Sequence, residues 1–198
     1  MTDSVKNQMV AGRLPDIHLN EEGQSQAEKL GAAIAVLKIR AIYSSPLERA
    51  IETAQTIAQR SDLKVETDDA FGELQFGDWT GKTFQELESE ERWRNFNSFR
   101  SGTRIPNGEL MLEAQTRIIT GLESLREKHS GETVAVVSHS DLIKVAVAHY
   151  AGIHIDLFQR VEIGPASISV IKVGDDAARI ITVNHRSELI DYQNSMNG

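Results

Sequence analysis

The stretch from Thr133 to Val137 is the feature that most limits how this chain can fold. The four residues after Thr133 are Val, Ala, Val and Val, with no alternation of polar positions. A strand with one face in water alternates apolar and polar side chains, whereas a strand covered on both faces is apolar throughout. We therefore expect a central parallel strand with helices packed on both faces of its sheet.

The segments around this strand alternate between helical and extended patterns. We expect helices over 21–37, 109–128 and 142–150 and after Pro46, strands over 41–43 and, more weakly, 64–67, and a hairpin from 168–173 and 179–183. Alternating strands and helices with one terminal antiparallel hairpin predict an α/β fold. The expected architecture is a three-layer α/β/α domain with a mixed, mostly parallel sheet.

The sequence Ser45-Pro46-Leu47-Glu48 has the pattern of a helix start. Serine is a favoured N-cap, proline fits the first helical position, and glutamate at the third position completes a capping box. The apolar residues that follow fall on one helical face. We therefore expect a helix with Ser45 as its N-cap.

Length and charge limit the class of protein. The chain has 198 residues, 40% of them hydrophobic, which suits one globular domain over 1–198. Its net charge is −8 and its basic residues are scattered, so neither nucleic acid nor an anionic membrane is an expected partner. It has no cysteine, no apolar signal segment and no run of about 18 apolar residues, so we expect a cytoplasmic protein.

Residues 82–105 form a polar segment within the domain. We interpret it as an insert that lids the site, although a solvated helical face has the same pattern. Arg92, Arg94 and Arg100 suggest that a lid here would favour a small acidic phosphoester.

Two strand-to-helix junctions carry polar groups where α/β sheets bind ligands, beyond the carboxyl ends of their strands. Arg49 falls in the first turn of its expected helix, where the helix dipole disfavours a cation unless an anion binds there. His139 ends the buried strand and faces a helix N-terminus, so it could donate to an oxyanion. A solvated arginine and a histidine bonded to a carbonyl are the alternatives.

Glu73 lies in a loop among Phe and Trp residues. Apolar surroundings raise the pKa of a carboxyl, which would suit a general acid near neutral pH, although acidic loop residues are usually solvated. The other histidines show no metal-ligand spacing, so we expect neither a metal site nor a cofactor.

Several motifs in order along the chain resemble those of the histidine phosphatase superfamily, the phosphoglycerate-mutase-like proteins. They are GR at 12–13, LNEEG at 19–23, SSPLERA at 44–50, Glu73 with FGDWTG at 76–81, and VSH at 137–139. Two further segments, NGE at 107–109 and DLFQR at 156–160, resemble a subgroup described as phosphomutases.

The resemblance implies a role for each matched residue. Arg49 would clamp the transferring phosphoryl group, His139 would donate to its oxygens, and Glu73 would protonate the leaving alkoxide. Ser140, which replaces the usual glycine after the second histidine, would bind the substrate. Ser4 or Asn7, of which we favour Asn7, would substitute for the phosphate-binding Asn that many members carry where Val5 stands.

The family nucleophile is a histidine in an Arg-His-Gly tripeptide that ends the first strand and forms a phosphohistidine. Neither the tripeptide nor that strand is present, and Met1-Thr2-Asp3 aligns with what should follow it. We therefore expect an N-terminally truncated domain whose first strand is absent, arising from a start placed too late. A chain that begins here and is catalytically dead is the alternative, although loss of a central strand would expose unpaired backbone.

The leading hypothesis is hydrolysis of a phosphomonoester, or mutase-type transfer, through a phosphohistidine in the full-length protein, with a small phosphorylated metabolite as substrate and this chain inactive as printed. The alternative is a non-catalytic phosphate-binding or scaffold protein. A serine hydrolase using Ser138, His139 and Asp141 is disfavoured, because three residues so close in sequence cannot readily meet and no Gly-x-Ser-x-Gly turn exists. Phosphatase and mutase, the substrate and the oligomeric state are not distinguished by the sequence.

Overall fold

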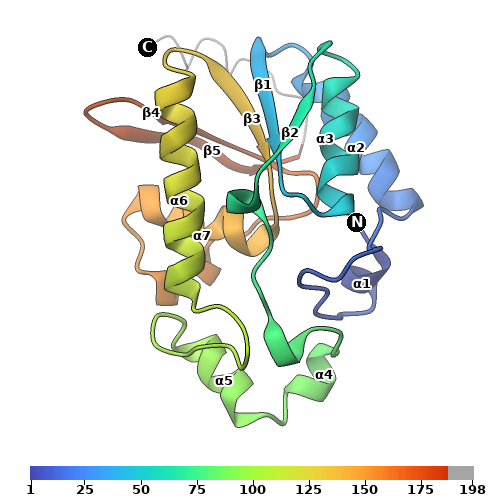
Figure 1. Ribbon diagram of the computed structural model, residues 1–198, viewed down its shortest axis with the longest axis vertical. Helices are drawn as coiled ribbons and strands as arrows, with labels where there is room; N and C mark the ends of the chain where they lie inside the picture. Colours follow the sequence, from blue (N-terminus) through green and yellow to red (C-terminus); the bar gives the residue numbers. More distant parts are fainter. Residues whose placement is uncertain (187–198) are drawn as a thin grey trace.

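The computed structural model describes residues 1–186, and three parallel strands form its central sheet (Figure 1). They are β1 (Ile39–Ser44), β2 (Val65–Thr67) and β3 (Thr133–Val137). Their order is β2-β1-β3, so β1 pairs on both edges. The strand predicted at 133–137 is confirmed with the same bounds.

The remaining elements are mostly helical. The α-helices are α1 (Asp3–Lys6), α2 (Glu21–Ile34), α3 (Glu48–Ala58), α4 (Phe84–Leu87), α5 (Glu91–Ser98), α6 (Met111–Lys128) and α7 (Ser140–Ala151). Short 3-10 helices are η1 (Asp69–Phe71), η2 (Gly77–Trp79) and η3 (Ile155–Arg160). None of the helices within residues 1–186 is both long and apolar enough to cross a membrane.

Helices cover both faces of the parallel sheet, as the unbroken apolar strand predicts. Alternate residues of a strand point to opposite faces. Ile42 of β1 therefore packs with Ile57 of α3, while the neighbouring Tyr43 joins the cluster that contains Leu142 of α7. The three-layer α/β/α prediction is confirmed.

The predicted hairpin is present as β4 (Ile168–Val173) and β5 (Ala178–His185), which pair antiparallel. Among the described residues these two strands form a sheet of their own. Val147 of α7 packs in one cluster with Ile171 and Ile180 of the hairpin. The edge of β3 that faces away from β1 therefore has no strand partner within residues 1–186.

Helix α3 starts later than its sequence pattern predicts. It begins at Glu48, and its N-cap is Leu47, which makes no side-chain capping bond. The predicted N-cap, Ser45, instead lies 2.7 Å from the His139 ring through its hydroxyl and accepts a hydrogen bond from the Leu47 N–H. The N-cap prediction was wrong, because the backbone of Leu47 is still extended and the helix begins only at Glu48.

Residues 82–105 contain α4 and α5 at the lower end of the molecule in Figure 1. Leu87, Phe96 and Ile105 of this insert are fully buried. The Trp79 ring lies 5.1 Å from the Trp93 ring and 5.2 Å from the Phe96 ring, centroid to centroid. The insert thus shares the hydrophobic core and is more than a solvated helical face, while its role as a lid stays a prediction.

Leu142 offers a test of the core between α7 and the sheet. Its side chain is fully buried, so Leu142→Ala should lower the free energy of unfolding by about 2–5 kcal/mol. Leu112→Ala is the matched control, because Leu112 is an exposed leucine of α6. Urea unfolding followed by circular dichroism measures both. Equal losses in the two variants would contradict this packing.

Candidate functional site

The carboxyl ends of β1 and β3 place two loops side by side. The Ser45 N–H donates to the Val137 carbonyl over 2.9 Å, which continues the strand pairing past the end of β1. The pairing brings Ser45 next to His139, the N-cap of α7. Such sheet edges are where α/β folds bind ligands.

His139 is almost fully buried, with 7% of its surface exposed. Burial lowers its pKa well below the ordinary value, and the positive charges of Arg49, Arg13 and Arg117 lower it further. The ring is therefore neutral at physiological pH. A neutral imidazole carries one N–H donor and one acceptor nitrogen, so His139 can donate one hydrogen bond to an oxygen.

Glu73 lies beside His139, with 3.7 Å between Oε2 and Nδ1. Its Oε1 accepts from the Leu74 N–H over 2.8 Å. Burial raises the pKa of Glu73 to about 7, and the negative charge of Asp141 also raises it. Because the pKa of the histidine falls while that of the glutamate rises, we interpret the contact at neutral pH as one between a neutral imidazole and a partly protonated carboxyl, and not as a salt bridge. The two residues to which the resemblance assigns catalytic roles thus lie side by side.

Two arginines whose charges act on His139 have buried N–H groups without a hydrogen-bond partner. Arg49 donates from Nη2 to the Gly12 carbonyl over 2.8 Å, and Arg13 donates from Nε to the Glu73 carbonyl over 2.7 Å. Nη1 of Arg49 and Nη2 of Arg13 are buried without a hydrogen-bond partner. A buried donor left unpaired costs about 1–3 kcal/mol, which an anionic ligand would recover.

Arg117 of α6 fixes the loop that carries Glu73. Its Nη1 donates to three carbonyls, those of Asp69, Ala70 and Gly72, over 2.9–3.0 Å. Its Nε and Nη2 pair with the two carboxylate oxygens of Glu109 at 3.1 and 3.2 Å. The guanidinium therefore holds the loop by hydrogen bonds that a more mobile lysine could not reproduce together.

No site role was predicted for Arg13, Arg117 or Ser45. Arg13 stands in the GR motif, and Ser45 in the segment SSPLERA, so both positions carried a signal. Arg117 carried none, because it falls within a long amphipathic helix where solvated arginines are common.

Two residues that were predicted to bind substrate make no hydrogen bond to this cluster within residues 1–186. Ser140, the first residue of α7, is exposed and its hydroxyl donates to the Ile163 carbonyl over 2.9 Å. Asn7 is the C-cap of α1 and is also exposed. Their roles in binding stay predictions.

The side chains of the serine-hydrolase alternative are directed elsewhere. The Ser138 hydroxyl donates to the Phe71 carbonyl over 2.7 Å, and Asp141 lies 3.8 Å from Arg100. Ser45 does lie beside His139, but its side chain is fully buried and thus closed to a substrate. The geometry gives no support to a serine nucleophile.

Three other histidines lie beside carboxylates, but within the described residues these pairs do not form a metal-binding group. His18 pairs with Glu52, His129 with Glu132, and His154 lies near Asp156. Within the described part of the chain, no three or more His, Cys, Asp or Glu side chains converge as metal ligands would.

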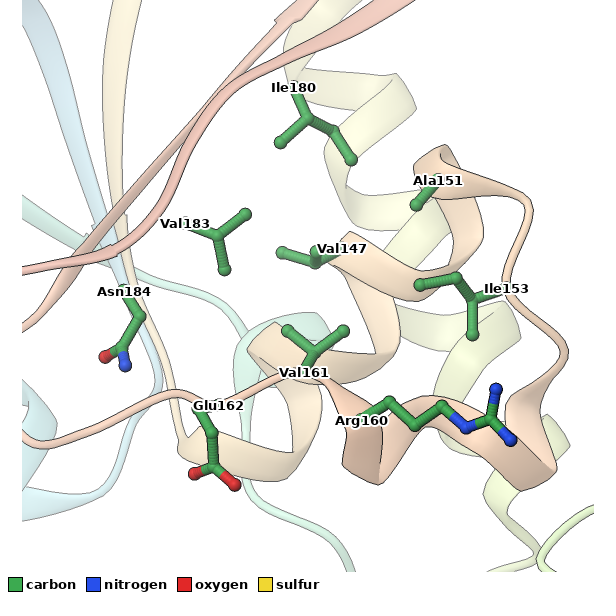
Figure 2. A pocket seen from close by; sticks show the side chains of 9 residues that line it. All are labelled: Val147, Ala151, Ile153, Arg160, Val161, Glu162, Ile180, Val183 and Asn184. Carbon is green, nitrogen blue, oxygen red and sulfur yellow. The ribbon is translucent and has the colours of Figure 1, made fainter.

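A cavity of about 450 Å³ lies apart from this cluster, between α7, η3 and the hairpin (Figure 2). Figure 2 shows Val147, Ile180 and Val183 pointing into the space, with Arg160 and Glu162 near its rim. Its lining is mainly apolar and contains none of the residues that surround Glu73. Converging donors mark a site for a charged ligand better than volume does, so we place the candidate site at Glu73 and His139.

Comparison with known proteins identifies relatives that match between 65% and 90% of this chain. Phosphoserine phosphatase 1 of Hydrogenobacter thermophilus is 30% identical over 181 residues, which cover 90% of this chain and 86% of that protein. Phosphoglycerate mutase-like protein 4 of Arabidopsis thaliana is 37% identical over 134 residues, 65% of this chain, and the match spans 58% of the plant protein.

Solved structures share the fold. A mutant phosphoserine phosphatase from Entamoeba histolytica in complex with phosphoserine superposes with a TM-score of 0.86 at 26% identity, over 96% of this chain and 94% of that one. The family model described as the histidine phosphatase superfamily (branch 1) matches residues 2–186. The resemblance noted in the motifs is therefore confirmed, and the chain belongs to the histidine phosphatase superfamily.

Proposed function

We propose that the site binds the phosphoryl group of a small phosphorylated metabolite and serves metal-independent phosphomonoester hydrolysis or phosphoryl transfer. The observation that carries the proposal is the pair of buried, unpartnered N–H groups on Arg49 and Arg13 beside His139 and Glu73. Phosphoryl oxygens are acceptors that guanidinium groups bind well. The names of the relatives, phosphoserine phosphatase and phosphoglycerate mutase-like protein, support this class of substrate.

The proposed reaction has two steps on one histidine. The nucleophilic nitrogen attacks phosphorus, the bond from phosphorus to the ester oxygen breaks, and Glu73 gives its proton to the leaving alkoxide. Water then attacks the phosphohistidine while Glu73 accepts the proton of that water, which frees the histidine and phosphate. Arg49 and His139 donate to the phosphoryl oxygens in both steps. A Glu73 pKa of about 7 suits a group that must first give and then accept a proton.

The nucleophile itself is the remaining requirement. The cluster around Glu73 contains one histidine, His139, whose Nε2 contacts Ser45. We infer that the nucleophile enters on a strand ending in Arg-His-Gly that pairs with the open edge of β3. The unpaired edge of β3 and the separate β4–β5 sheet support this placement, because a strand between them would join the two sheets. Residues 1–198 alone would then bind phosphate without turnover.

Turnover of p-nitrophenyl phosphate by two purified proteins tests the proposal. One protein is the chain as printed, and the other adds a strand ending in Arg-His-Gly ahead of Met1. We expect turnover by the extended protein alone, inhibited by vanadate and unaffected by EDTA. If neither folded protein turns over while both bind phosphate, the non-catalytic binding function replaces the enzymatic one. Absence of phosphate binding in both would contradict the proposal altogether.

Arg49→Gln should weaken phosphate binding to the chain as printed. The variant loses a charged donor whose hydrogen bonds are worth about 1.5–3 kcal/mol, so the Kd should rise about 10- to 100-fold. Isothermal titration calorimetry with inorganic phosphate measures the change. The control is Arg60→Gln, which removes an exposed arginine two residues beyond the end of α3. A Kd that rises equally in both variants would argue against a clamp at Arg49.

Glu73→Gln should change how stability depends on pH. The folded-state pKa of Glu73, about 7, lies above its ordinary value of 4.5, so the folded state holds this proton while the unfolded state releases it. Stability therefore falls as pH rises from the ordinary value to the folded one, by about 3 kcal/mol.

The glutamine cannot ionise, so this fall is absent from the variant. Urea unfolding gives the free energy of unfolding of Glu73→Gln and of the unmodified chain at about pH 4 and at about pH 8. The difference between the two proteins should shift in favour of Glu73→Gln at the higher pH. Glu28→Gln, at an exposed position of α2, is the control and should keep the original pH dependence. Parallel pH profiles for the original chain and Glu73→Gln would refute a protonated Glu73.

A further inference from the structure

Ser45 connects the ends of β1 and β3 with the starts of α3 and α7. Its hydroxyl oxygen lies 2.7 Å from Nε2 of His139, the N-cap of α7. The same oxygen accepts a hydrogen bond from the N–H of Leu47, the N-cap of α3, over 3.3 Å. Ser45 is fully buried, so its polar groups depend on protein partners and not on water.

Pro46 explains why the backbone supplies this bond from Leu47. Proline has no N–H, so the Leu47 N–H is the first backbone donor after Ser45. That donor occupies one side of the Ser45 oxygen. The hydroxyl proton of Ser45 is then left for a different partner.

The partners of the Ser45 hydroxyl can be counted. A serine hydroxyl donates one proton and accepts through two lone pairs. The Leu47 N–H takes one lone pair, and within residues 1–186 the other hydrogen-bond contact of this oxygen is with Nε2 of His139. The direction of the bond to His139 therefore decides whether the Ser45 proton has an acceptor.

A neutral His139 ring can meet Ser45 in two ways. If Nε2 carries the ring proton, the Ser45 oxygen accepts twice and its own proton is buried without an acceptor. If Nδ1 carries the ring proton, Ser45 donates to Nε2 and both residues are satisfied. The cost of a buried, unpaired donor favours the second arrangement by about 5- to 150-fold.

The Nδ1 side of the ring faces the candidate site. Nδ1 lies 3.7 Å from Oε2 of Glu73, which is longer than a hydrogen bond. The cations that act on the ring, those of Arg13, Arg49 and Arg117, are donors and cannot accept its proton. A proton on Nδ1 is thus available to an oxygen of a bound ligand.

We propose that Ser45 is a positioning residue, whose hydroxyl donates to Nε2 of His139 and so holds the ring proton on Nδ1 for donation to a phosphoryl oxygen. The inference rests on the proposed function, in which His139 donates to the phosphoryl group. The opposite tautomer would turn a lone pair toward the same oxygens and repel them. The segment SSPLERA at 44–50 then has two roles, because it supplies Arg49 and also orients the proton of His139.

Nitrogen-15 NMR of the histidine-labelled chain near neutral pH measures the position of the proton. The chain has six histidines, and the signals that disappear in His139→Gln belong to this ring. We expect Nδ1 to have the chemical shift of a protonated nitrogen and Nε2 that of an unprotonated one. A proton on Nε2, alone or in a doubly protonated ring, would overturn the proposal, and this result needs no variant of Ser45.

Three variants test whether Ser45 sets the tautomer. Ser45→Ala removes the hydroxyl and should move a measurable fraction of the ring proton from Nδ1 to Nε2. Ser44→Ala is the matched control, because Ser44 is equally buried and donates to the Ser45 carbonyl instead of the ring. Glu73→Gln changes the other neighbour and should leave the proton on Nδ1. An unchanged spectrum in Ser45→Ala, or an equal change in either other variant, would show that Ser45 does not hold the proton.

Phosphate binding measures the consequence for the site. Ser45→Ala should raise the Kd of inorganic phosphate about 2- to 10-fold, because part of the His139 population no longer donates from Nδ1. Isothermal titration calorimetry gives the Kd, with Ser44→Ala again as the control. A displaced proton with an unchanged Kd would contradict donation from Nδ1 to phosphate.

The inference and the proposed function fail on different measurements. A proton on Nε2 in a chain that binds phosphate contradicts the inference alone. A chain that does not bind phosphate contradicts the proposed function, whichever nitrogen of His139 carries the proton.

Discussion

The parallel pairing of β1 with β3 is the constraint on which the candidate site depends. It runs from Ile39 opposite Thr133 to Ser44 opposite Val137 and continues in the hydrogen bond from Ser45 to Val137. Helices cover both faces of the pair, so a register slip of one residue would place each strand's side chains against the wrong layer. Apolar packing therefore fixes the relative positions of Arg49, in the first turn of α3, and of His139, the N-cap of α7, although neither residue belongs to the core of the sheet.

Charge and burial act in the same direction on His139 at this edge of the sheet. Arg13, Arg49 and Arg117 surround a histidine that their charges and its burial keep neutral. Backbone carbonyls and Glu109 satisfy Arg117, but donors of Arg13 and Arg49 are left unpaired. Such unpaired donors lower stability in the free protein and become favourable contacts when an anion arrives. The site thus holds its donors in place before binding, which reduces the reorganisation that binding requires.

Local sequence patterns predicted the elements better than they predicted the contacts between them. The strand at 133–137 was predicted with its observed bounds because an unbroken apolar run is typical of a doubly covered strand. Ser45 was predicted as the N-cap of α3, but the helix begins at Glu48, and no local rule predicts the contact of the Ser45 hydroxyl with His139. Motif resemblance placed Glu73 and His139 in one site, and the structure brings them to 3.7 Å. The role of Arg117 depends on the path of the loop over residues 69–73, which no local pattern reveals.

The free edge of β3 has a consequence for how this chain behaves in solution. Within the described residues, one side of a Val-rich strand offers backbone N–H and C=O groups to no neighbouring strand. Exposed edges of this kind recruit strands from other molecules, and natural proteins usually cover them with charge, proline or another element. Edge-to-edge association of copies would compete with folding to a monomer as the protein concentration rises. Dilution, or a short peptide that pairs with the edge, would then favour the monomer.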